Sequence, residues 1–486
     1  MVINWHLFFE FIIILNAVLA IITVFRQKRD IAAIWAWLLV LTFLPIIGFI
    51  IYAFFGRKLP KNRLFKLHNH VQMQLDERLT DQRSQEGNSN FSESDLISSE
   101  YRNVVDLFIN SDFAFLARKN RIHIFTDGND LFHRMIEDIE AAKSSINIEF
   151  YTFYNDEIGN EMLDLLVKKA QEGVEVRVLY DAFGSLGTTR KFFEPLRKAG
   201  GYAYPFLNTH SFIIDFRINF RDHRKIVVID GKIGYIGGYN IGDQYLNRSK
   251  KFGRWRDTHL RIVGSAVFGL QSRFVLDWDA TSTEAQFNEK KVDAKYFPVS
   301  ATKGTANVQV VSSGPNSENQ QIKLGYIKMI LSAKRYCWIQ TPYLIPDDSV
   351  LDAIKIAIQS GVDVRIMVPN MPDHPFVYRA TQYYANQLAQ EGVKIYYYQD
   401  GFLHAKTTMI DGKLASVGSA NYDFRSFKLN FETNSFIYDE TITKELTQIY
   451  KEDIKNSILQ TPEMFNQQSS WLKFKQIFSR LFSPIL

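Results

Sequence analysis

Two long apolar runs near the N-terminus have the length of membrane-spanning helices. Residues 7–25 carry Glu10 as their one charge, and residues 31–56 carry none. About 20 apolar residues span a bilayer core, whereas a cleavable signal peptide begins with basic residues and is shorter. The pattern predicts a retained two-helix transmembrane hairpin over residues 1–58. Because a carboxylate in hydrocarbon is costly, a buried or interfacial helix is the alternative for the first run.

Basic residues flank both runs. Lys and Arg occur in the loop at 26–30 and, in greater number, at 57–66. Positive charge favours the cytoplasmic side, so the flanks predict a cell-membrane protein whose main body is cytoplasmic. The segment 59–115 is mostly polar and is predicted to be a juxtamembrane connector, exposed and partly helical at best.

Beyond the connector, apolar runs typical of strands alternate with helical patterns. The strand-like runs include INIEFYTF at 146–153, VEVRVLYD at 174–181 and KIVVIDGKIGYIGG at 225–238. Alternation of this kind predicts an α/β fold.

The order of these elements repeats along the chain. SAKRYCWIQTPYLI at 332–345 follows the pattern of AAKSSINIEFYTF at 141–153, and GVDVRIMVP at 361–369 follows GVEVRVLYD at 173–181. The offset drifts between about 181 and 192 residues, as loop lengths would change it. Two copies of one α/β unit are therefore predicted.

One short motif occurs once in each copy. The first copy reads HRKIVVIDGKIGYIGGYN and the second HAKTTMIDGKLASVGSAN, so both fit H-x-K-x₄-D-x₆-G-x₂-N without a gap. Two matches with the same Gly and Asn spacing are rare by chance. The shared positions are His223, Lys225, Asp230, Gly237 and Asn240 in the first copy, and His404, Lys406, Asp411, Gly418 and Asn421 in the second.

This motif suits the chemistry of a phosphate ester. In an extended strand, residues i and i+2 share a face, so each copy places an imidazole beside an ammonium. The lysine neutralises phosphate oxygens and the asparagine amide donates hydrogen bonds to them. Transfer through a covalent intermediate needs a nucleophile and an acid for the leaving oxygen, and two facing copies supply both. A metal site is not expected, because a lysine beside each histidine repels a cation.

Composition narrows the function classes further. At 486 residues the chain has room for two or three domains. Its single cysteine, Cys337, excludes an internal disulfide and thiolate metal clusters. The net charge of +5 is too small to indicate a nucleic-acid binder.

The doubled motif resembles that of the phospholipase D superfamily, in which two halves place their motifs in one site. The resemblance covers residues 116–486 and implies two pseudo-symmetric phospholipase D-like α/β sandwich domains, at 116–300 and 301–486. Within the superfamily, the two apolar runs, RWRDTHLRIVG at 254–264 and GFLHAK at 401–406 resemble bacterial cardiolipin synthases.

The resemblance also implies roles for single residues. His223 is the nucleophile and His404 the general acid and then base, although the near-symmetry of the site leaves the reverse assignment open. Asp257 and Glu432 match acidic positions thought to orient the histidines, and a salt bridge with neighbours such as Arg256 is their alternative role. Lys225, Lys406, Asn240 and Asn421 hold the phosphate, while Asp230 and Asp411, counted with the catalytic motif, brace it internally.

The implied reaction joins two phosphatidylglycerol molecules into cardiolipin and glycerol, with a phosphohistidine intermediate and without cofactor or metal. Phosphatidylglycerol and anionic membrane lipids are the expected partners. A hydrolase, or a transferase that uses another alcohol, is the alternative. A nuclease is disfavoured by the apolar runs and by the lack of a basic stripe with interleaved aromatic residues. Both motifs are intact, which argues against an inactive scaffold.

The C-terminal segment WLKFKQIFSRLFSPIL predicts an amphipathic helix. It has aromatic residues at helical spacing with Lys473, Lys475 and Arg480 on other faces. Such a helix lies either in an anionic membrane surface or against the second domain, and packing on the domain is slightly favoured. Asp373 and His374 are expected near the site without a catalytic role.

Overall fold

The computed structural model describes residues 31–44, 47–52, 93–207, 219–282, 284, 287, 295–298, 304–317 and 319–485, together with Leu15, Val18 and Ile22. The first predicted span therefore lies almost wholly outside the described residues. The chain divides into two compact units, one containing residues 1–60 and 209–220 and the other 61–208 and 221–486. The second unit is called the body below.

The N-terminal unit contains two described helices, α2 (Ile31–Phe43) and α3 (Ile47–Ile51). Within the predicted second span, α2 ends at Phe43, two residues before Pro45 in the sequence, in keeping with the tendency of helices to end before a proline. Trp37 and Tyr52 meet edge to face at 5.0 Å. Within the described parts of the chain, no helix is both long and apolar enough to cross a membrane.

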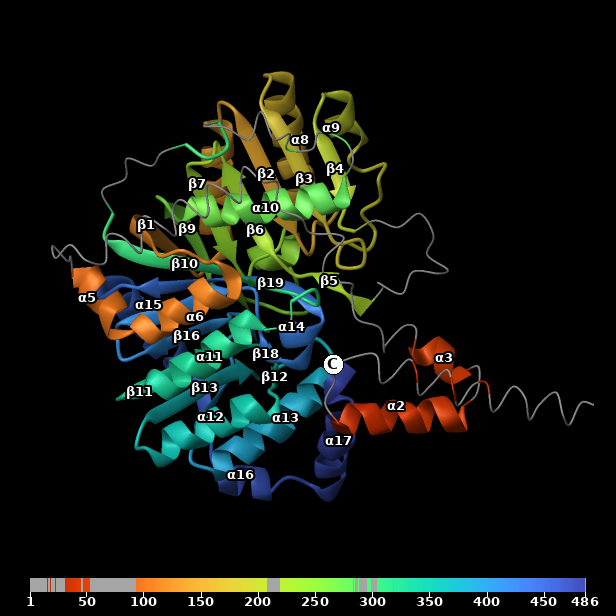
Figure 1. Cartoon of the computed structure of the whole chain (residues 1–486), viewed down its shortest axis with the longest axis vertical. Coiled ribbons are helices and arrows are strands. Elements are labelled where there is room, and N and C mark those ends of the chain that lie inside the picture. The colour runs from red at the N-terminus through yellow and green to blue at the C-terminus, as the bar shows by residue number, and fades with distance from the viewer. Residues whose placement is uncertain are drawn as a thin grey trace, which may run out of the picture. The chain divides into compact units, whose positions relative to one another are not determined.

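The body is built on one continuous 16-stranded sheet (Figure 1). Its order is β20-β14-β13-β11-β16-β17-β19-β10-β1-β9-β7-β6-β2-β3-β4, with β5 paired to β19. The seven strands of the first half are β1 (Ala117–Phe125), β2 (Ser145–Phe150), β3 (Glu175–Tyr180), β4 (Tyr202–Pro205), β6 (Lys225–Ile229), β7 (Ile233–Gly237) and β9 (His259–Val263). The second half adds β10 (Ala306–Ser313), β11 (Tyr336–Gln340), β13 (Asp363–Pro369), β14 (Lys394–Tyr398), β16 (Thr407–Ile410), β17 (Leu414–Gly418), β19 (Asn430–Tyr438) and the edge strand β20 (Ser457–Gln460).

The two halves repeat one strand order in opposite directions from the centre of the sheet. Outward from the centre, β1-β9-β7-β6-β2-β3-β4 matches β10-β19-β17-β16-β11-β13-β14. The antiparallel pair of β1 and β10 joins the halves, with Ala117 opposite Val308. The predicted repeat is confirmed, and the halves share one sheet instead of forming two separate ones. The predicted boundary at residues 300 and 301 lies outside the described residues.

Helices cover both faces of the inner strands of each half. In the first half, β2 and β6 are therefore buried along their whole length. The first half carries α7 (Gly128–Glu140), α8 (Glu157–Gln171), α9 (Glu194–Lys198), the 3₁₀ turn η3 (Asp243–Leu246) and α10 (Val267–Thr281). The second half carries α11 (Gln321–Ser332), α12 (Asp348–Gln359), α13 (Pro375–Gln390), α14 (Phe424–Lys428), α15 (Glu440–Lys455), α16 (Pro462–Asn466), α17 (Ser470–Arg480) and the 3₁₀ turn η4 (Ser483–Ile485).

The end of the predicted connector is folded into the body. Residues Glu93–Glu100 form α5 and Arg102–Asp112 form α6. Helix α6 buries Val104, Val105, Phe108 and Ile109, and Phe108 packs on Phe436 of β19 with ring centroids 4.3 Å apart. The apolar spacing of these four residues explains why a segment with a polar beginning ends as a packed helix.

Candidate active site

Two short strand pairs bring the motifs of the two halves together. Strand β5 (Arg221–Asp222) pairs in parallel with the start of β19, and β8 (Trp255–Arg256) pairs with β15 (Phe402–Leu403). In each pair, one half's strand leads directly into a histidine and the other half's strand leads into an acidic residue. The His223 amide donates to the Phe431 carbonyl at 2.9 Å, and the His404 amide to the Arg256 carbonyl at 2.7 Å. Each histidine is therefore anchored by the opposite half.

The side chains continue this exchange between the halves. His223 Nδ1 lies 3.0 Å and 2.9 Å from the two carboxylate oxygens of Glu432. His404 Nδ1 lies 2.6 Å from Asp257 Oδ2. Both carboxylates are fully buried. A carboxylate on Nδ1 favours the tautomer that leaves the lone pair of Nε2 for chemistry.

The alternative role for Asp257, a salt bridge with Arg256, does not describe this structure. Arg256 instead forms a two-pronged ion pair with Asp453, at 3.0 Å and 2.7 Å. The carboxylate of Asp257 contacts His404 and its own neighbour Thr258. The structure thus supports an orienting position for Asp257 and a structural one for Arg256.

Both motif lysines lie beside their histidines, as the strand alternation predicts. Lys225 Nζ donates to the His223 carbonyl at 2.6 Å, and Lys406 Nζ donates to the His404 carbonyl. Lys406 Nζ also lies 3.9 Å from Asp257 Oδ2. Arg224, between the two site residues of the first copy, is directed elsewhere and pairs with Asp277 at 2.9 Å.

Burial and mutual repulsion lower the pKa values of the histidines and lysines of the site. Burial, followed by the charges of Lys225 and Lys406, lowers the pKa of His223 well below its usual value. Burial and Lys406 lower the pKa of His404 to about 4, against the pull of Asp257. Burial lowers the pKa of Lys225 to about 7 and that of Lys406 to about 8. Both imidazoles are therefore neutral at pH 7 before a substrate anion binds.

The two carboxylates differ in their protonation. Burial raises the pKa of Glu432 to about 7, although Lys225 and several hydrogen-bond donors act against it. Burial also disfavours ionisation of Asp257, but Lys406 and His404 prevail and hold its pKa below the usual value. Asp257 is therefore the more fully ionised of the two carboxylates.

Both motif asparagines are buried. Each follows its histidine along the chain and already forms some of its hydrogen bonds with other groups of the protein. The Asn240 amide donates to the Tyr245 hydroxyl at 3.1 Å, and its oxygen accepts from the Thr152 amide at 3.2 Å. The Asn421 amide donates to Asp423 at 3.0 Å. Each NH₂ group has a second hydrogen, so contact with a phosphate stays a prediction for both.

Asp230 and Asp411 occupy turns at the far ends of their strands. Asp230 accepts hydrogen bonds from the backbone amides of residues 143–145, and Asp411 from those of residues 334–336. Each lies seven positions along the chain after its histidine, with β6 or β16 between them, which is about 20 Å of extended chain. The position of these two motif aspartates fits the internal bracing that the sequence also suggests, and their grouping with the catalytic motif stays a prediction.

Asp230→Asn is expected to lower stability and leave chemistry intact. The substitution replaces an ionised acceptor of three backbone amides, so unfolding becomes easier by about 2 kcal/mol. Denaturant unfolding of the variant measures the loss, and the transfer rate per folded molecule is expected to stay within about threefold of the parent. A folded variant with a loss of 100-fold or more would return Asp230 to the catalytic group.

Sequence reasoning missed the residues that support Glu432. Ser419 Oγ donates to Glu432 at 2.5 Å, and Asn430 donates to it at 3.2 Å. The equivalent of Ser419 in the first copy is Gly238, where an added Cβ would lie 2.0 Å from Asp257 Oδ1. This asymmetry is visible in the sequence, because the first motif ends in GGYN and the second in GSAN.

The residues Asp373 and His374 lie at the edge of the site. Asp373 accepts a hydrogen bond from Tyr343, and its charge is close enough to raise the pKa of Lys406 against the effect of burial. The side chain of His374 is 71% exposed. Within the described part of the chain, neither forms a hydrogen bond or ion pair with His223 or His404.

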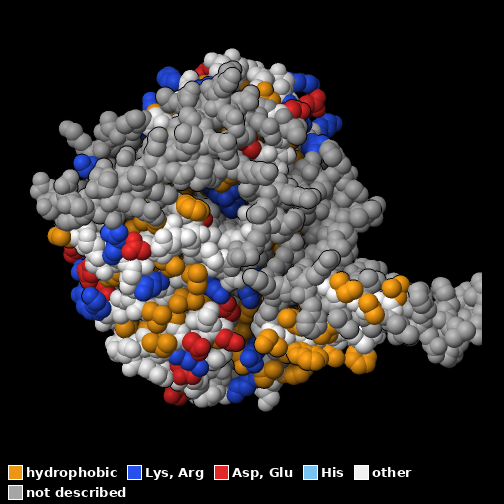
Figure 2. Space-filling view, viewed as in Figure 1, with side chains coloured by type: hydrophobic (Ala, Val, Ile, Leu, Met, Phe, Trp, Pro, Cys, Tyr) orange, Lys and Arg blue, Asp and Glu red, His pale blue; other side chains and the backbone are white. Residues whose placement is uncertain are grey.

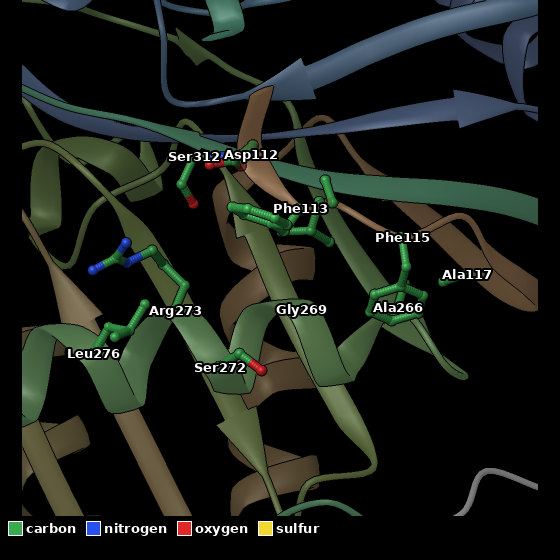
Figure 3. A pocket seen from close by; sticks show the side chains of 12 residues that line it. Asp112, Phe113, Phe115, Ala117, Ala266, Gly269, Ser272, Arg273, Leu276 and Ser312 are labelled. Carbon is green, nitrogen blue, oxygen red and sulfur yellow. The ribbon is translucent and has the colours of Figure 1, made fainter. Parts of the chain in front are cut away.

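A cavity of about 100 Å³ lies elsewhere in the body, between α6, β1, α10 and β10 (Figure 3). Asp112, Phe113 and Arg273 are among its lining residues. None of the described residues that line it belongs to either motif. The described residues also contain no cluster of three or more His, Cys, Asp or Glu side chains arranged to bind a metal ion.

Comparison with known proteins agrees with the doubled site. The family described as cardiolipin synthase, phospholipase D-like domain, matches residues 135–252 and 326–454, one match in each half. A second family, described as phospholipase D-nuclease N-terminal, matches residues 14–57. The fold and the paired motifs thus define a member of the phospholipase D superfamily.

Relatives narrow the family within this superfamily. The chain is 50% identical over 475 residues to a cardiolipin synthase of Listeria innocua, covering 98% of both chains. It is 48% identical over 473 residues to a cardiolipin synthase of Staphylococcus aureus, covering 97% of this chain and 95% of that one. The chain belongs to the cardiolipin synthase family of the phospholipase D superfamily.

Solved structures show the same fold at low sequence identity. A phosphatidylserine synthase from Haemophilus influenzae aligns with a TM-score of 0.58 and 18% identity, over 80% of this chain and all of that one. A polyphosphate kinase from Porphyromonas gingivalis aligns with a TM-score of 0.50 and 13% identity, over 74% of this chain and 53% of that one.

Proposed function

We propose that this chain transfers a phosphatidyl group from one phosphatidylglycerol to another through a phosphohistidine, giving cardiolipin and glycerol. The observation that carries the proposal is the reciprocal pairing of His223 with Glu432 and of His404 with Asp257. A lysine lies beside each of the two imidazoles. The site therefore has the charges and the two imidazole groups that a two-step reaction at a phosphodiester requires. The membership in the cardiolipin synthase family agrees with it.

The unequal carboxylates support the assignment of His223 as nucleophile. A nucleophile must be neutral, and His223 has the weaker anion, Glu432, on Nδ1. A general acid must hold a proton, and His404 has the ionised Asp257 at 2.6 Å to stabilise its imidazolium form. The phosphate anion of the substrate adds to this stabilisation when it binds.

The reaction then has two steps. His223 Nε2 forms a bond to phosphorus, the bond from phosphorus to the glycerol oxygen breaks, and His404 gives its proton to that oxygen. In the second step His404 takes the proton of the terminal hydroxyl of another phosphatidylglycerol, whose oxygen displaces His223. Lys225 and Lys406 balance the charge that develops on the non-bridging oxygens.

The membrane position of the chain is part of the proposal. Helix α2 exposes Ile31, Trp35, Leu39 and Phe43 on one face, each by 53–75%. An exposed stripe of large apolar residues suits lipid better than water. The N-terminal unit is proposed to lie in the cell membrane, with the body on the cytoplasmic side as the basic flanks indicate.

The activity is tested with purified full-length protein in phosphatidylglycerol vesicles that contain a chelator. Cardiolipin and glycerol are expected in equal amounts. Phosphatidic acid in place of cardiolipin would overturn the transferase proposal in favour of a hydrolase, and a strict need for added metal would overturn the metal-free route.

The pH dependence of kcat/KM is expected to show an alkaline loss and no acid loss near pH 6.5. The proposed acid His404 has a pKa of about 4, so kcat/KM already declines gradually as the pH rises above it. The decline becomes steeper as Lys225 and Lys406 lose their phosphate-binding charge through their pKa values of about 7 and about 8. The nucleophile His223 stays neutral well below pH 6.5, since its pKa is lowered. Because kcat/KM reports the free enzyme, kcat should keep its activity to higher pH than kcat/KM.

Lys225→Arg provides the matching control. A guanidinium keeps its charge throughout this range, so the variant is slower, but its steep alkaline loss is expected to move up by about one pH unit, to the range where Lys406 loses its charge. An unchanged alkaline limb would show that another group controls it.

A further inference from the structure

The C-terminal helix α17 packs on the body with its polar side and exposes its apolar side. Gln476 and Ser479 are its buried residues. A surface helix in water normally has the opposite orientation. The apolar residues of this segment that are at least 37% exposed are Trp471, Phe474, Ile477, Phe478, Leu481 and Phe482.

Specific contacts hold α17 in this orientation. Gln476 donates to Gln468 at 2.9 Å and lies 3.5 Å from Gln382 of α13. Tyr384 of α13 donates to Ser483 at 3.3 Å. Turning the helix to bury its rings would break these hydrogen bonds, so the exposed apolar side is part of the fold.

The exposed rings form a continuous aromatic ridge, defined here as Trp471, Phe474, Phe478, Phe482 and Phe376. Successive ring centroids along this order lie 5.5, 6.1, 5.3 and 6.0 Å apart. All five ridge residues are at least 37% exposed. On the face drawn in Figure 2, hydrophobic side chains lie among Lys, Arg, Asp and Glu side chains over the second half of the body.

One end of the ridge lies near residues whose charges act on the proposed site. Phe376 lies at the start of α13, three residues after Asp373, whose charge acts on Lys406. At this same end, η4 follows Phe482 and packs on α14, and α14 carries Arg425, whose charge acts on His223. A surface that held the ridge would therefore lie close to the elements that carry Asp373 and Arg425.

The charges around the ridge match an anionic surface. Residues 467–486 contain Lys473, Lys475 and Arg480 and no acidic residue. Lys475 lies over the Trp471 ring at 5.2 Å, and Arg480 lies over the Tyr383 ring at 4.8 Å. Aromatic residues with flanking cations are the composition of helices that lie in the interface of anionic membranes.

We propose that the aromatic ridge and its three cations insert into the headgroup layer of a bilayer rich in anionic phospholipid. This contact holds the mouth of the site at the lipid surface, independently of the N-terminal unit. The inference rests on the proposed function only for the lipid that enters the site.

The test labels the ridge in full-length protein reconstituted into vesicles. Cys337 is buried, so a cysteine introduced as Phe478→Cys takes a fluorescent probe selectively. In phosphatidylglycerol vesicles, lipids with a spin label near the headgroup are expected to quench this probe at least about threefold more than a probe at Lys168→Cys on α8. The difference is expected to shrink in phosphatidylcholine vesicles, which lack the anionic charge.

A functional measurement separates membrane contact from chemistry. The double substitution of Phe474→Ser with Phe478→Ser is expected to lower transfer from bilayer phosphatidylglycerol by about tenfold or more. Its rate on dibutyryl phosphatidylglycerol dissolved in water should stay within about twofold of the parent. Leu331→Ser, at an exposed apolar residue of α11, is the matched control and should change neither rate.

Equal quenching at both labels would overturn the proposal, as would contact between probes on two copies of the chain without lipid quenching. Equal losses on bilayer and dissolved substrate in a folded double variant would also overturn it. Quenching at the ridge in a protein that made no cardiolipin would support the membrane contact and count against the proposed function alone.

Discussion

Replacing His223 or His404 with alanine is expected to abolish transfer between lipids, by at least about 10⁴-fold, at different steps for the two variants. His223→Ala has no nitrogen that can bond to phosphorus, so no phosphoenzyme forms. His404→Ala keeps the nucleophile and its partner Glu432 but lacks the proton for the departing glycerol. Phosphatidyl-p-nitrophenol, whose phenolate leaves without a proton, should therefore still phosphatidylate His404→Ala.

The measurement is a burst of nitrophenolate together with radiolabelled lipid retained on the denatured protein. Label on His404→Ala and none on His223→Ala is the expected pattern. The reverse pattern would exchange the two roles, and near-normal transfer in either variant would contradict the mechanism with two histidines.

The second large effect is expected from Asp257→Asn. An asparagine amide can donate to His404 Nδ1, and it does not stabilise the imidazolium that must protonate the leaving oxygen. Loss of a buried carboxylate behind a catalytic histidine costs about 10³- to 10⁴-fold in comparable sites. Steady-state kinetics in vesicles should show the loss in kcat, with thermal unfolding close to that of the parent.

Asp453→Asn is the matched control, because Asp453 is the partner of the neighbouring Arg256. Breaking that buried ion pair is expected to reduce stability by about 3 kcal/mol while the folded enzyme keeps most of its kcat. A folded Asp453→Asn variant that lost as much kcat as Asp257→Asn would show that the ion pair, and not the Asp257 contact with His404, controls the chemistry.

Much of the fold and of the site followed from local patterns in the sequence. The repeat of strand-like runs predicted two α/β halves, and the alternation of side chains along a strand predicted that Lys225 and Lys406 lie beside their histidines. These features depend on residues close in sequence. The resemblance of WRDTH and NFETN to acidic positions of a family then pointed to Asp257 and Glu432.

The exchange of partners between halves was beyond local patterns. His223 and Glu432 are 209 residues apart, and their contact depends on β5 reaching across to β19. Similarly, the amphipathic pattern of α17 predicted a helix with two faces but not that the polar face lies inward. That choice depends on the polar partners offered by α13, such as Gln382 and Tyr384.

The reciprocal anchoring of the histidines also governs when the chain can first become reactive during its synthesis. Glu432 is added 209 residues after His223, which at about 5–20 residues per second is a delay of about 10–40 s. Throughout that interval the first half carries a complete motif but lacks the Glu432 carboxylate that contacts its imidazole. Asp257 likewise has no histidine partner until His404 has been synthesised. A nascent chain beside its own lipid substrate therefore remains inert until the second half has been made and docked.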